Sequence, residues 1–424
     1  MSTPLIMVLG PSGAELGDKI AASIGGEVAA RGEDFSSTAE FVQDAFVAGK
    51  PVIGLCAAGI LIRTLGPLVS DKHSEPPVIA VAEDGSSIVP LLGGHHGAND
   101  LAREIAALTG GHAAITTAGD VRFGIALDGP PEGYVLANRE HAKPAMAALL
   151  AGASAKLSGA AEWLSSSDLP FSADGEVELC ITHHAVTGNE KRLVYHPKNL
   201  VLGVGSSRGC PADEMIALVE DVLKANKLSR HAIACIASID VKADEAAMHA
   251  LAVHLNVPVR FFSAEILNQQ AARLANPSDV VLAEVGCPGV AEGAALSGAG
   301  ASSTLMVEKT KTAHATCAIA LAREPVNAFG VGRARGWVSV VGIGPGQEEW
   351  RSGEASHLLR VASDWVGYGL YLDIVAELSV GRTQHRFDLG EEETRVRHAL
   401  ELAGEGRDVA LVCSGDAGIY AMAA

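Results

Sequence analysis

Short apolar runs alternate with helix-like patterns over the first 120 residues of the chain. The helix-like segment Gly97–Leu108 repeats apolar residues at helical spacing, which places Leu101, Ile105 and Leu108 on one face. The apolar runs have the length of buried strands, and the expected strands are Leu5–Leu9, Val52–Leu55, Val78–Ala82, Ile88–Leu92 and Ala113–Thr116. This alternation predicts an α/β domain with a mostly parallel sheet in residues 1–120.

The same alternation returns in residues 200–325. Helical patterns begin at Ala212 and Ala243, between apolar runs. The expected strands are Leu200–Gly205, His231–Ser238, Val257–Phe262, Val280–Val285 and Thr304–Glu308. A series of this kind predicts a second domain, built on a parallel sheet with right-handed crossovers.

The other parts of the chain differ in pattern. Residues 121–199 are rich in Ala, Ser, Pro and His and lack a clear period, so we expect an irregular middle segment. Residues 326–336 are rich in Gly and Arg and predict a linker. Residues 337–424 contain two buried strands that run into glycine turns, within Trp337–Gly346 and Val409–Tyr420, and predict another α/β domain. The predicted fold class is therefore α/β, with several domains and mostly parallel sheets.

Composition and charge narrow the choice of partners and compartment. The 424 residues are 48% hydrophobic and carry a formal net charge of −18, which would repel nucleic acid and an anionic membrane surface. No apolar run reaches the roughly 18–20 residues that span a bilayer. Met1–Gly10 lacks the pattern of a secretory signal. The seven cysteines include no C-x-x-C pair, so we expect reduced thiols and a cytoplasmic protein.

The turn Gly93–Asn99 carries the candidate chemistry of the first domain. It reads G-G-H-H-G-A-N, so His95, His96 and Asn99 would lie near a helix N-terminus that attracts anions. Together with Lys72, from the nearby D-K-H-S-E-P-P, they can supply a general base and an electrophilic clamp. The alternative is a solvated loop whose histidines bond to the backbone. No metal is expected, because neither H-E-x-x-H nor Cys₂His₂ spacing occurs.

A second motif, Gly205–Gly209, fits the G-x-S-x-G pattern of a nucleophile elbow between a strand and a helix. Ser207 would then be the nucleophile of a serine hydrolase. The later histidines that could complete a triad are His231, His249, His254 and His314. The alternative is that Ser206 and Ser207 only cap the helix behind Pro211.

Basic residues gather at one expected edge of the 200–325 sheet. Arg208 and Lys309 could meet at the carboxyl edge, with Lys311 close by on the same strand end as Lys309. A carboxylate-rich ligand would bind such a group of cations, whereas the alternative is that they are simply solvated.

The loop Gly342–Gly346 reads G-I-G-P-G and could be mistaken for a dinucleotide-binding turn. Gln347 stands where G-x-G-x-x-G requires its third glycine, and Pro345 stands where the helix N-terminus would form. A nicotinamide dinucleotide site is therefore disfavoured against a plain tight turn or another ligand loop. The glycines would let backbone N–H groups approach such a ligand closely.

Long motifs in the chain resemble known families. Residues 71–85 (D-K-H-S-E-P-P-V-I-A-V-A-E-D-G) and 90–102 (P-L-L-G-G-H-H-G-A-N-D-L-A) resemble the N-terminal domain of the CbiG family of cobalamin biosynthesis. Three further segments resemble the C-terminal domain of that family: L-V-L-G-V-G-S-S-R-G (200–209), V-A-E-G-A-A-L (290–296) and V-E-K-T-K (307–311). Residues 337–424 resemble precorrin-3B C(17)-methyltransferase, of the tetrapyrrole methylase family, through V-V-G-I-G-P-G, G-Y-G-L-Y-L-D, H-R-F-D-L-G and C-S-G-D-A-G-I-Y.

The CbiG resemblance implies a cobalt-precorrin-5A hydrolase, which opens a δ-lactone and releases acetaldehyde. It does not imply a serine nucleophile, because the family usually carries Cys or Arg where Ser206 and Ser207 stand. The middle segment matches the family poorly. We therefore keep a rival hypothesis, in which residues 1–325 bind or deliver corrinoid intermediates without catalysis.

The methylase resemblance implies S-adenosylmethionine as methyl donor and precorrin tetrapyrroles as substrates. By position, Gly344, Pro345 and Gly346 would face the donor and the tetrapyrrole. Three further residues, Gly415, Asp416 and Tyr420, would contact the methionine part of the donor. The residues expected to bind the tetrapyrrole are Arg208, Lys309, Lys311 and Tyr368. We also expect residues 337–424 to be the first half of a methylase fold, a fragment that binds the donor weakly, and a homodimer formed through this part.

Overall fold

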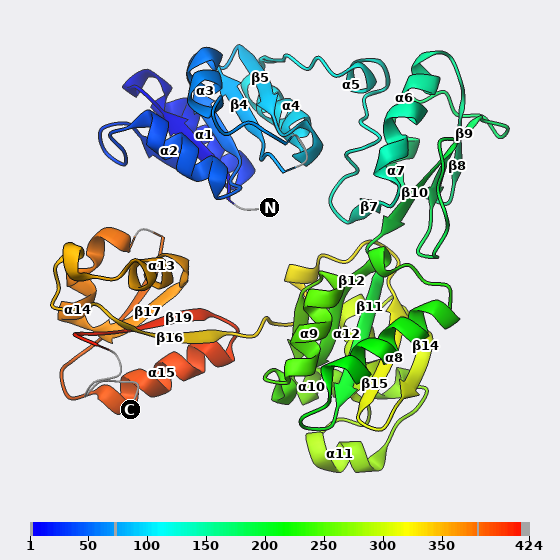
Figure 1. Ribbon diagram of the computed structural model, residues 1–424, viewed down its shortest axis with the longest axis vertical. Coiled ribbons are helices and arrows are strands. Elements are labelled where there is room, and N and C mark those ends of the chain that lie inside the picture. Colours follow the sequence, from blue (N-terminus) through cyan, green and yellow to red (C-terminus); the bar gives the residue numbers. More distant parts are fainter. Residues whose placement is uncertain (1–2, 72–73, 380, 417–424) are drawn as a thin grey trace. The chain divides into compact units, whose positions relative to one another are not determined.

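The computed structural model describes residues 3–71, 74–379 and 381–416, leaving out the side chain of His95 (Figure 1). The chain divides into two compact units. The first comprises Met1–Thr182 and Val186–His196, and the second comprises His183–Ala185 and Pro197–Ala424. Each unit contains two β-sheets, and the mixed α/β architecture with mostly parallel sheets confirms the predicted fold class.

The first unit begins with a six-stranded sheet. Its strands, in spatial order, are β2 (Glu27–Ala30), β1 (Leu5–Val8), β3 (Val52–Leu55), β4 (Val78–Val81), β5 (Ser87–Leu92) and β6 (His112–Ala113). All neighbours are parallel except β4 and β5, which pair antiparallel with Val78 opposite Leu92. The central strands are continuous apolar runs because both faces of this sheet are covered.

Helices cover both faces of this sheet. Ile20 of α1 (Ala14–Ile24) and Ile105 of α4 (Ala98–Thr109) pack on one face, in one cluster of buried residues. The other face carries α2 (Thr38–Val47) and α3 (Ala58–Leu65), through residues such as Phe46 and Leu61. The predicted helix Gly97–Leu108 therefore corresponds to α4. Of its predicted apolar face, Ile105 is buried and Leu101 packs against the same cluster, whereas Leu108 is 43% exposed.

The middle segment is folded, so the prediction of an irregular segment is wrong. A four-stranded sheet has the order β7 (Tyr134–Leu136), β10 (Arg192–Pro197), β9 (Val177–Ile181) and β8 (Ala155–Ser158). It is accompanied by α5 (Ala118–Phe123), α6 (Ala142–Leu150) and α7 (Glu162–Ser165). Phe123, Leu149, Leu164 and Tyr195 share one buried apolar cluster, which gives this segment a core of its own.

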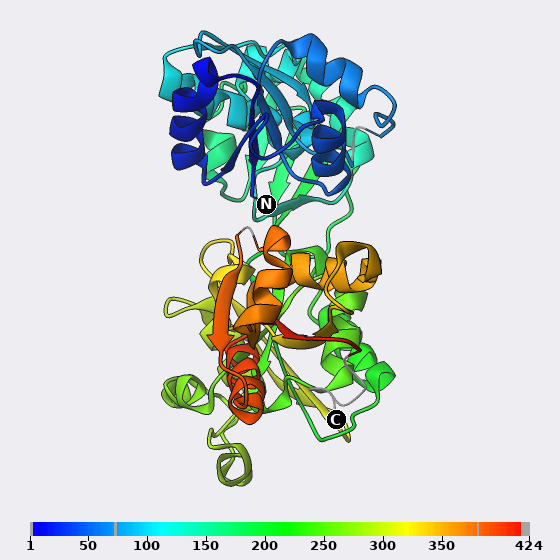
Figure 2. The same ribbon diagram turned by 90° about the vertical axis from the view of Figure 1, so that its left-hand side faces the viewer.

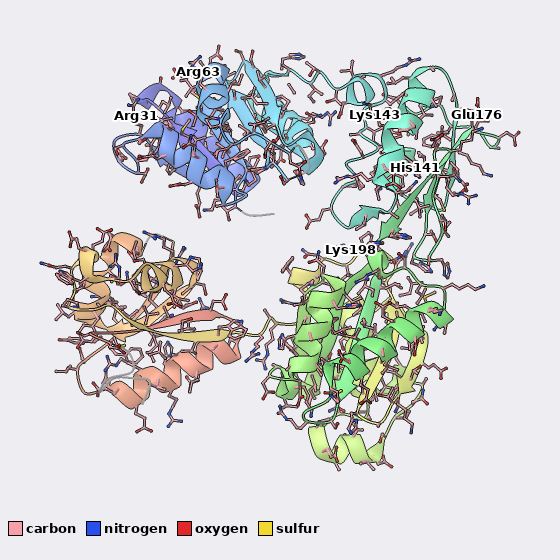
Figure 3. All side chains as sticks on the ribbon, in the orientation of Figure 1. Arg31, Arg63, His141, Lys143, Glu176 and Lys198 are labelled. Atoms are coloured by element: carbon pink, nitrogen blue, oxygen red, sulfur yellow. The ribbon has the colours of Figure 1, made fainter. Side chains whose placement is uncertain are left out.

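The sheet of residues 200–321 begins only two residues after β10. One of these two is Lys198, labelled in Figure 3, whose carbonyl accepts a hydrogen bond from the N–H of Val326 at 2.9 Å. The strand order is β13 (Val259–Phe262), β12 (Ile233–Ile239), β11 (Leu200–Ser206), β15 (Ala315–Leu321) and β14 (Thr304–Lys311). The first three strands are parallel, whereas β15 runs antiparallel to both of its neighbours. The sheet is therefore mixed.

Helices cover both faces of this sheet as well. On one face lie α8 (Ala212–Ala225) and α9 (Ala246–Leu255), and on the other α10 (Ala264–Asn268) and α12 (Val290–Ala299). The predicted strand Val280–Val285 is wrong, because these residues belong to helix α11 (Asp279–Val285). The Ser278 hydroxyl accepts from the N–H of Val281 at its start, and Gly286, at φ +78°, ends it.

Residues 337–413 form the last sheet, which can be followed in orange and red in Figure 2. It is fully parallel, in the order β16 (Trp337–Gly342), β19 (Asp408–Cys413), β17 (Asp364–Tyr368) and β18 (Thr383–Phe387). The helices are α13 (Gly353–Val361), α14 (Gly369–Ile374) and α15 (Glu392–Gly404).

Within the described ranges, no single helix has the length and apolar character needed to cross a membrane. Only α11 and α12 taken together meet that test, and they bend by 75° at the break between them.

Candidate functional site

A cleft of about 1060 Å³ lies in the first unit. Ligand pockets usually measure about 300–1,000 Å³, so this cleft can take a large ligand. The turn after β5 and the segment before β4 line it, together with residues 124–134 and Trp163. Six prolines, whose rings fix the backbone φ angle, contribute to its wall: Pro4, Pro51, Pro76, Pro77, Pro130 and Pro131.

The turn after β5 is built by direct contact with the segment before β4. Gly93 has φ +74°, and a Cβ there would lie 2.5 Å from the carbonyl oxygen of Pro76. Only glycine therefore lets the two segments approach this closely. Because β4 and β5 are antiparallel, this contact lies at the amino ends of the parallel strands, the edge opposite the usual ligand crevice.

The structure places two of the four predicted catalytic side chains. His96 is half-buried and lines the cleft, and its N–H donates to the carbonyl oxygen of Gly93 at 2.8 Å. The backbone of His95 belongs to the short helix Gly94–His96, but its side chain lies outside the described part of the structure. Lys72 also lies outside the described residues.

Asn99, the fourth predicted residue, is buried in a network that joins α4 to α5. Its Nδ2 donates to Asp120 Oδ2 at 3.1 Å and to Thr117 Oγ1 at 3.2 Å. The other carboxylate oxygen of Asp120 accepts from Arg103 Nη2 at 2.6 Å, and the Asp120 side chain is only 3% exposed. Asn99 therefore helps to hold α4 against α5 beside the cleft.

Sequence reasoning missed four residues that line this cleft. Arg103 lies one helical turn after Asn99, so the i,i+4 spacing could have shown that both share a face of α4. Asp120, Tyr134 and Trp163 belong to α5 and the middle segment. Residues 121–199 have no clear hydrophobic period, so the sequence gives no signal that residues of this segment line a cleft.

The predicted meeting of Arg208 and Lys309 does not occur. Arg208 Nη1 binds Asp244 Oδ1 at 2.5 Å, and the hydrogen bond from this guanidinium lowers the pKa of Asp244. Lys309 Nζ instead donates to the carbonyl oxygen of Asn276 at 2.9 Å. The two cations are held by different loops, because each finds an acceptor close to its own strand end. Lys311 is exposed at the end of β14.

Glu292 explains why two of the quoted motifs converge. It is 2% exposed, and its carboxylate accepts from the backbone N–H of Ala275, Asn276 and Lys309 and from Asn276 Nδ2, at 2.9–3.0 Å. Burial alone would raise the pKa of Glu292, but the hydrogen bonds from Asn276, Lys309 and Ala275 lower it. Lys309 therefore belongs to a structural clamp around the 275–276 loop.

The G-x-S-x-G loop joins β11 to α8, as the pattern requires, but it is not a strained elbow. Its single residue at positive φ is Gly209, at +71°, so Ser206 and Ser207 adopt ordinary backbone conformations. Neither serine caps α8 through its side chain. The N–H of Ser207 donates to the carbonyl oxygen of His314 at 2.9 Å, and His314 Nδ1 lies 2.8 Å from Glu214 Oε2.

The two glycine loops of residues 337–416 come together. The N–H of Gly344 donates to the carbonyl oxygen of Gly415 at 3.1 Å, and the N–H of Gly415 returns a bond to Gly344 at 3.0 Å. Both have positive φ, at +65° and +67°, and follow the adjacent strands β16 and β19. Pro345 and Asp416 are exposed beside them.

Gly346 and Tyr368 occupy the same edge of this sheet. Gly346 has φ +114°, and a Cβ on it would lie 3.5 Å from Ile374. Tyr368 ends β17, the strand beside β19, and its ring meets that of Tyr371 edge to face at 5.3 Å. The predicted Tyr420 lies outside the described residues.

The histidine of the H-R-F-D-L-G motif makes its contacts toward the opposite edge of the sheet, where β17 begins. His385 Nε2 lies 2.9 Å from Oδ1 of Asp364, a fully buried carboxylate at the start of β17, and His385 Nδ1 lies 2.9 Å from His398 Nε2. Arg407 Nη2 reaches the same Asp364 oxygen at 2.7 Å. These contacts tie β18 and α15 to the sheet, so the histidine of this motif is architectural.

Comparison with known proteins covers most of the chain. The family models Cobalamin synthesis G N-terminal and Cobalamin synthesis G C-terminus match residues 40–120 and 200–320. A cobalt-precorrin-5A hydrolase of Priestia megaterium is 29% identical over 300 residues, which cover 65% of this chain and 79% of the relative. Protein CobE of Sinorhizobium sp is 49% identical over 121 residues, 28% of this chain and 79% of CobE.

A different kind of relative matches a shorter stretch of the chain. The cobalamin biosynthesis protein CobIJ of Mycobacterium bovis is 46% identical over 88 residues, 21% of this chain. The matched residues span 17% of the length of that relative.

Proposed function

The chain belongs to the CbiG family of cobalamin synthesis proteins, continued by a methyltransferase-like segment, and on this premise we propose that its first unit opens the lactone of cobalt-precorrin-5A. The observation that carries the proposal is the cleft of about 1060 Å³, with His96 on its wall. The turn that holds His96 lies within the 40–120 family match.

Lactone hydrolysis needs a base for water and a group that stabilises the oxyanion. In our proposal His95 or His96 takes a proton from water, and the hydroxide attacks the lactone carbonyl. The tetrahedral intermediate then collapses: the bond between the carbonyl carbon and the ring oxygen of the lactone breaks, and the imidazolium gives its proton to the departing alkoxide oxygen. Lys72 assists as the electrophilic clamp, whereas Asn99 acts indirectly, by fixing α4 against α5. The freed alcohol then loses its proton to a base, its carbon–carbon bond to the macrocycle breaks so that acetaldehyde departs, and the macrocycle keeps the electron pair and takes up a proton.

The test replaces both histidines. The double variant His95→Ala/His96→Ala and the wild-type chain are given cobalt-precorrin-5A, and acetaldehyde is measured with a coupled dehydrogenase. We expect a loss of about 10²-fold or more, the usual contribution of a general base. A matched control is His183→Ala/His184→Ala, another adjacent pair, outside the cleft. Undiminished release by the His95/His96 variant would refute the assignment.

A second candidate function is binding or delivery of corrinoid intermediates without catalysis. The observation that favours it is the match to CobE. The matched residues span 79% of CobE but only 28% of this chain, so a related protein exists without most of the rest of this chain. This function predicts stoichiometric binding of cobalt-precorrin-5A with no acetaldehyde. Turnover by the wild-type chain would exclude it for the first unit.

Residues 337–424 support a further proposal, that this segment contributes to a site for S-adenosylmethionine. The bound donor would supply a methyl group on a sulfonium. Gly344, Gly346 and Gly415 present backbone without side chains at one sheet edge, and a Cβ on Gly415 would meet nothing within 4 Å, so the loops leave room for a ligand. Pro345 and Asp416 flank it, and Tyr420 would add to it.

Two further expectations remain, one for this segment together with Lys311 of β14 and one for this segment alone. We propose that Tyr368 and Lys311 contact precorrin substrates, and that the methylase part forms a homodimer. For the donor site, titration calorimetry with S-adenosylmethionine should give several-fold weaker binding for Asp416→Asn than for the wild type. Equal affinity would remove Asp416 from the donor site.

A further inference from the structure

We infer that Trp163 and Tyr134 form an aromatic wall that binds the flat, conjugated face of a macrocyclic ligand in the cleft of the first unit. This inference rests on the proposed function, because it names how that site holds its substrate. Both residues line the cleft, and both come from the middle segment, which neither family model matches.

The wall is braced by a third aromatic residue. The Trp163 ring meets Tyr134 at 5.8 Å between centroids and Tyr195 at 5.3 Å, both edge to face. Tyr195 is fully buried, and its hydroxyl donates to the carbonyl oxygen of Leu127 at 2.7 Å. Trp163 is therefore held in one orientation by the core of the middle segment, and loses little conformational entropy when a ligand stacks on it.

The same cleft also contains the proposed chemical groups. Asp120 of α5 binds Arg103 and Asn99 of α4, and this buried network joins the middle segment to the helix that follows the His96 turn. A ligand in the cleft can therefore contact the imidazole of His96 and the aromatic wall at once.

Charge does not explain binding in this part of the cleft. The acidic residues of the described lining are Asp100, Glu104, Asp120 and Glu132. The guanidinium of Arg103 is already bound to Asp100 and Asp120, at 2.6 Å each. A polycarboxylate would gain little from these described side chains, so we expect contact between flat surfaces to carry much of its affinity, beside the proposed clamp Lys72. We therefore expect binding not to weaken between 50 and 500 mM NaCl, unlike binding by a basic surface.

The experiment measures binding and turnover on the full chain. The probe is cobyrinic acid, a stable corrin with carboxylate side chains, titrated by calorimetry, and KM and kcat come from acetaldehyde release. Stacking on one aromatic side chain contributes about 1–3 kcal/mol in nucleic-acid complexes. We expect Trp163→Ala to raise Kd and KM about tenfold or more with a smaller change in kcat, and Trp163→Phe to restore most of the affinity. Trp350→Ala, an exposed tryptophan of the methylase-like segment, is the matched control.

A folded Trp163→Ala protein that binds the probe as well as the wild type would overturn the inference. If this variant does not fold, Trp163→Leu and Tyr134→Leu replace it, and unchanged Kd in both has the same meaning. Binding that depends on Trp163 without acetaldehyde release would refute the hydrolase proposal and support the wall. Acetaldehyde release with KM and Kd unchanged by substitution of Trp163 would support the hydrolase proposal and refute the aromatic wall.

Discussion

Gly344 and Gly415 bond to each other through both of their backbone N–H groups, at 3.1 and 3.0 Å. They are separated by about seventy residues of sequence, yet they follow adjacent parallel strands, so the pairing places two loops at one sheet edge. Backbone donors and acceptors are used to join the loops, and glycine is required because φ is positive at both positions.

Gly344→Ala should destabilise the second unit by about 1–2 kcal/mol, the cost of a side chain at left-handed φ. A Cβ there would also lie 3.0 Å from the carbonyl oxygen of Trp350. Urea unfolding measures the change. Gly353→Ala is the control, because Gly353 opens α13 and a Cβ on it would meet nothing within 4 Å. Equal stability of the two variants would show that the loop tolerates a different conformation.

Glu292→Gln should cost about 2–4 kcal/mol of unfolding free energy. The substitution turns one buried acceptor oxygen into an NH₂ group that faces backbone N–H donors, and hydrogen bonds to a charged group are lost. Denaturant unfolding at neutral pH tests this. The neighbouring Glu308→Gln should stay within about 0.5 kcal/mol of the wild type, because Glu308 is exposed. A mild effect at Glu292 would mean that the 275–276 loop does not depend on the carboxylate.

The stability of the second unit should depend on the ionisation of Glu214. The Thr312 hydroxyl, the backbone N–H of His314 and the His314 ring lower the pKa of Glu214 from 4.5 to about 2. A carboxyl group with a lowered folded pKa stabilises the protein above its ordinary pKa, and this contribution is lost as the pH falls from 4.5 towards 2. The difference in unfolding free energy between wild type and Glu214→Gln should therefore shrink from pH 6 to pH 3.

Asn99→Ala should lower stability and activity together. Removing the amide takes one donor from the buried carboxylate of Asp120, which costs about 1–3 kcal/mol. For stability, Asp100→Asn is the control, because the Asp100 side chain is 79% exposed and such surface pairs contribute less than about 1 kcal/mol. If activity fell while the unfolding curve stayed unchanged, Asn99 would act on the substrate itself.

Much of the strand pattern could be predicted because buried parallel strands are continuous apolar runs. Val52–Leu55 was predicted with its bounds, and Leu200–Gly205 with an error of one residue. The error at Val280–Val285 has a physical cause, since a short apolar run fits a strand or a helix equally well. Ser278 and Gly286, a start and a stop signal for a helix, were present in the sequence and decide the matter.

The candidate site was only partly predictable. His96 could be found because a glycine-flanked turn between a strand and a helix marks a loop that carries polar groups. Trp163 could not, because its place in the cleft depends on the fold of the middle segment and on the contact between α4 and α5. Arg208 and Lys309 show a related limit, since strand ends share an edge while nearer acceptors decide where long side chains bind.

The position of the short helix α5 determines where a truncated version of this protein should end. The N-terminal family match ends at residue 120, yet α5 runs from Ala118 to Phe123 and contributes the buried Asp120. A truncation at residue 120 would place Asp120, the carboxylate partner of Arg103, at the end of the chain, and would remove Trp163. The segment of the protein that folds together with its cleft extends to His196, well beyond the segment that a family comparison delineates.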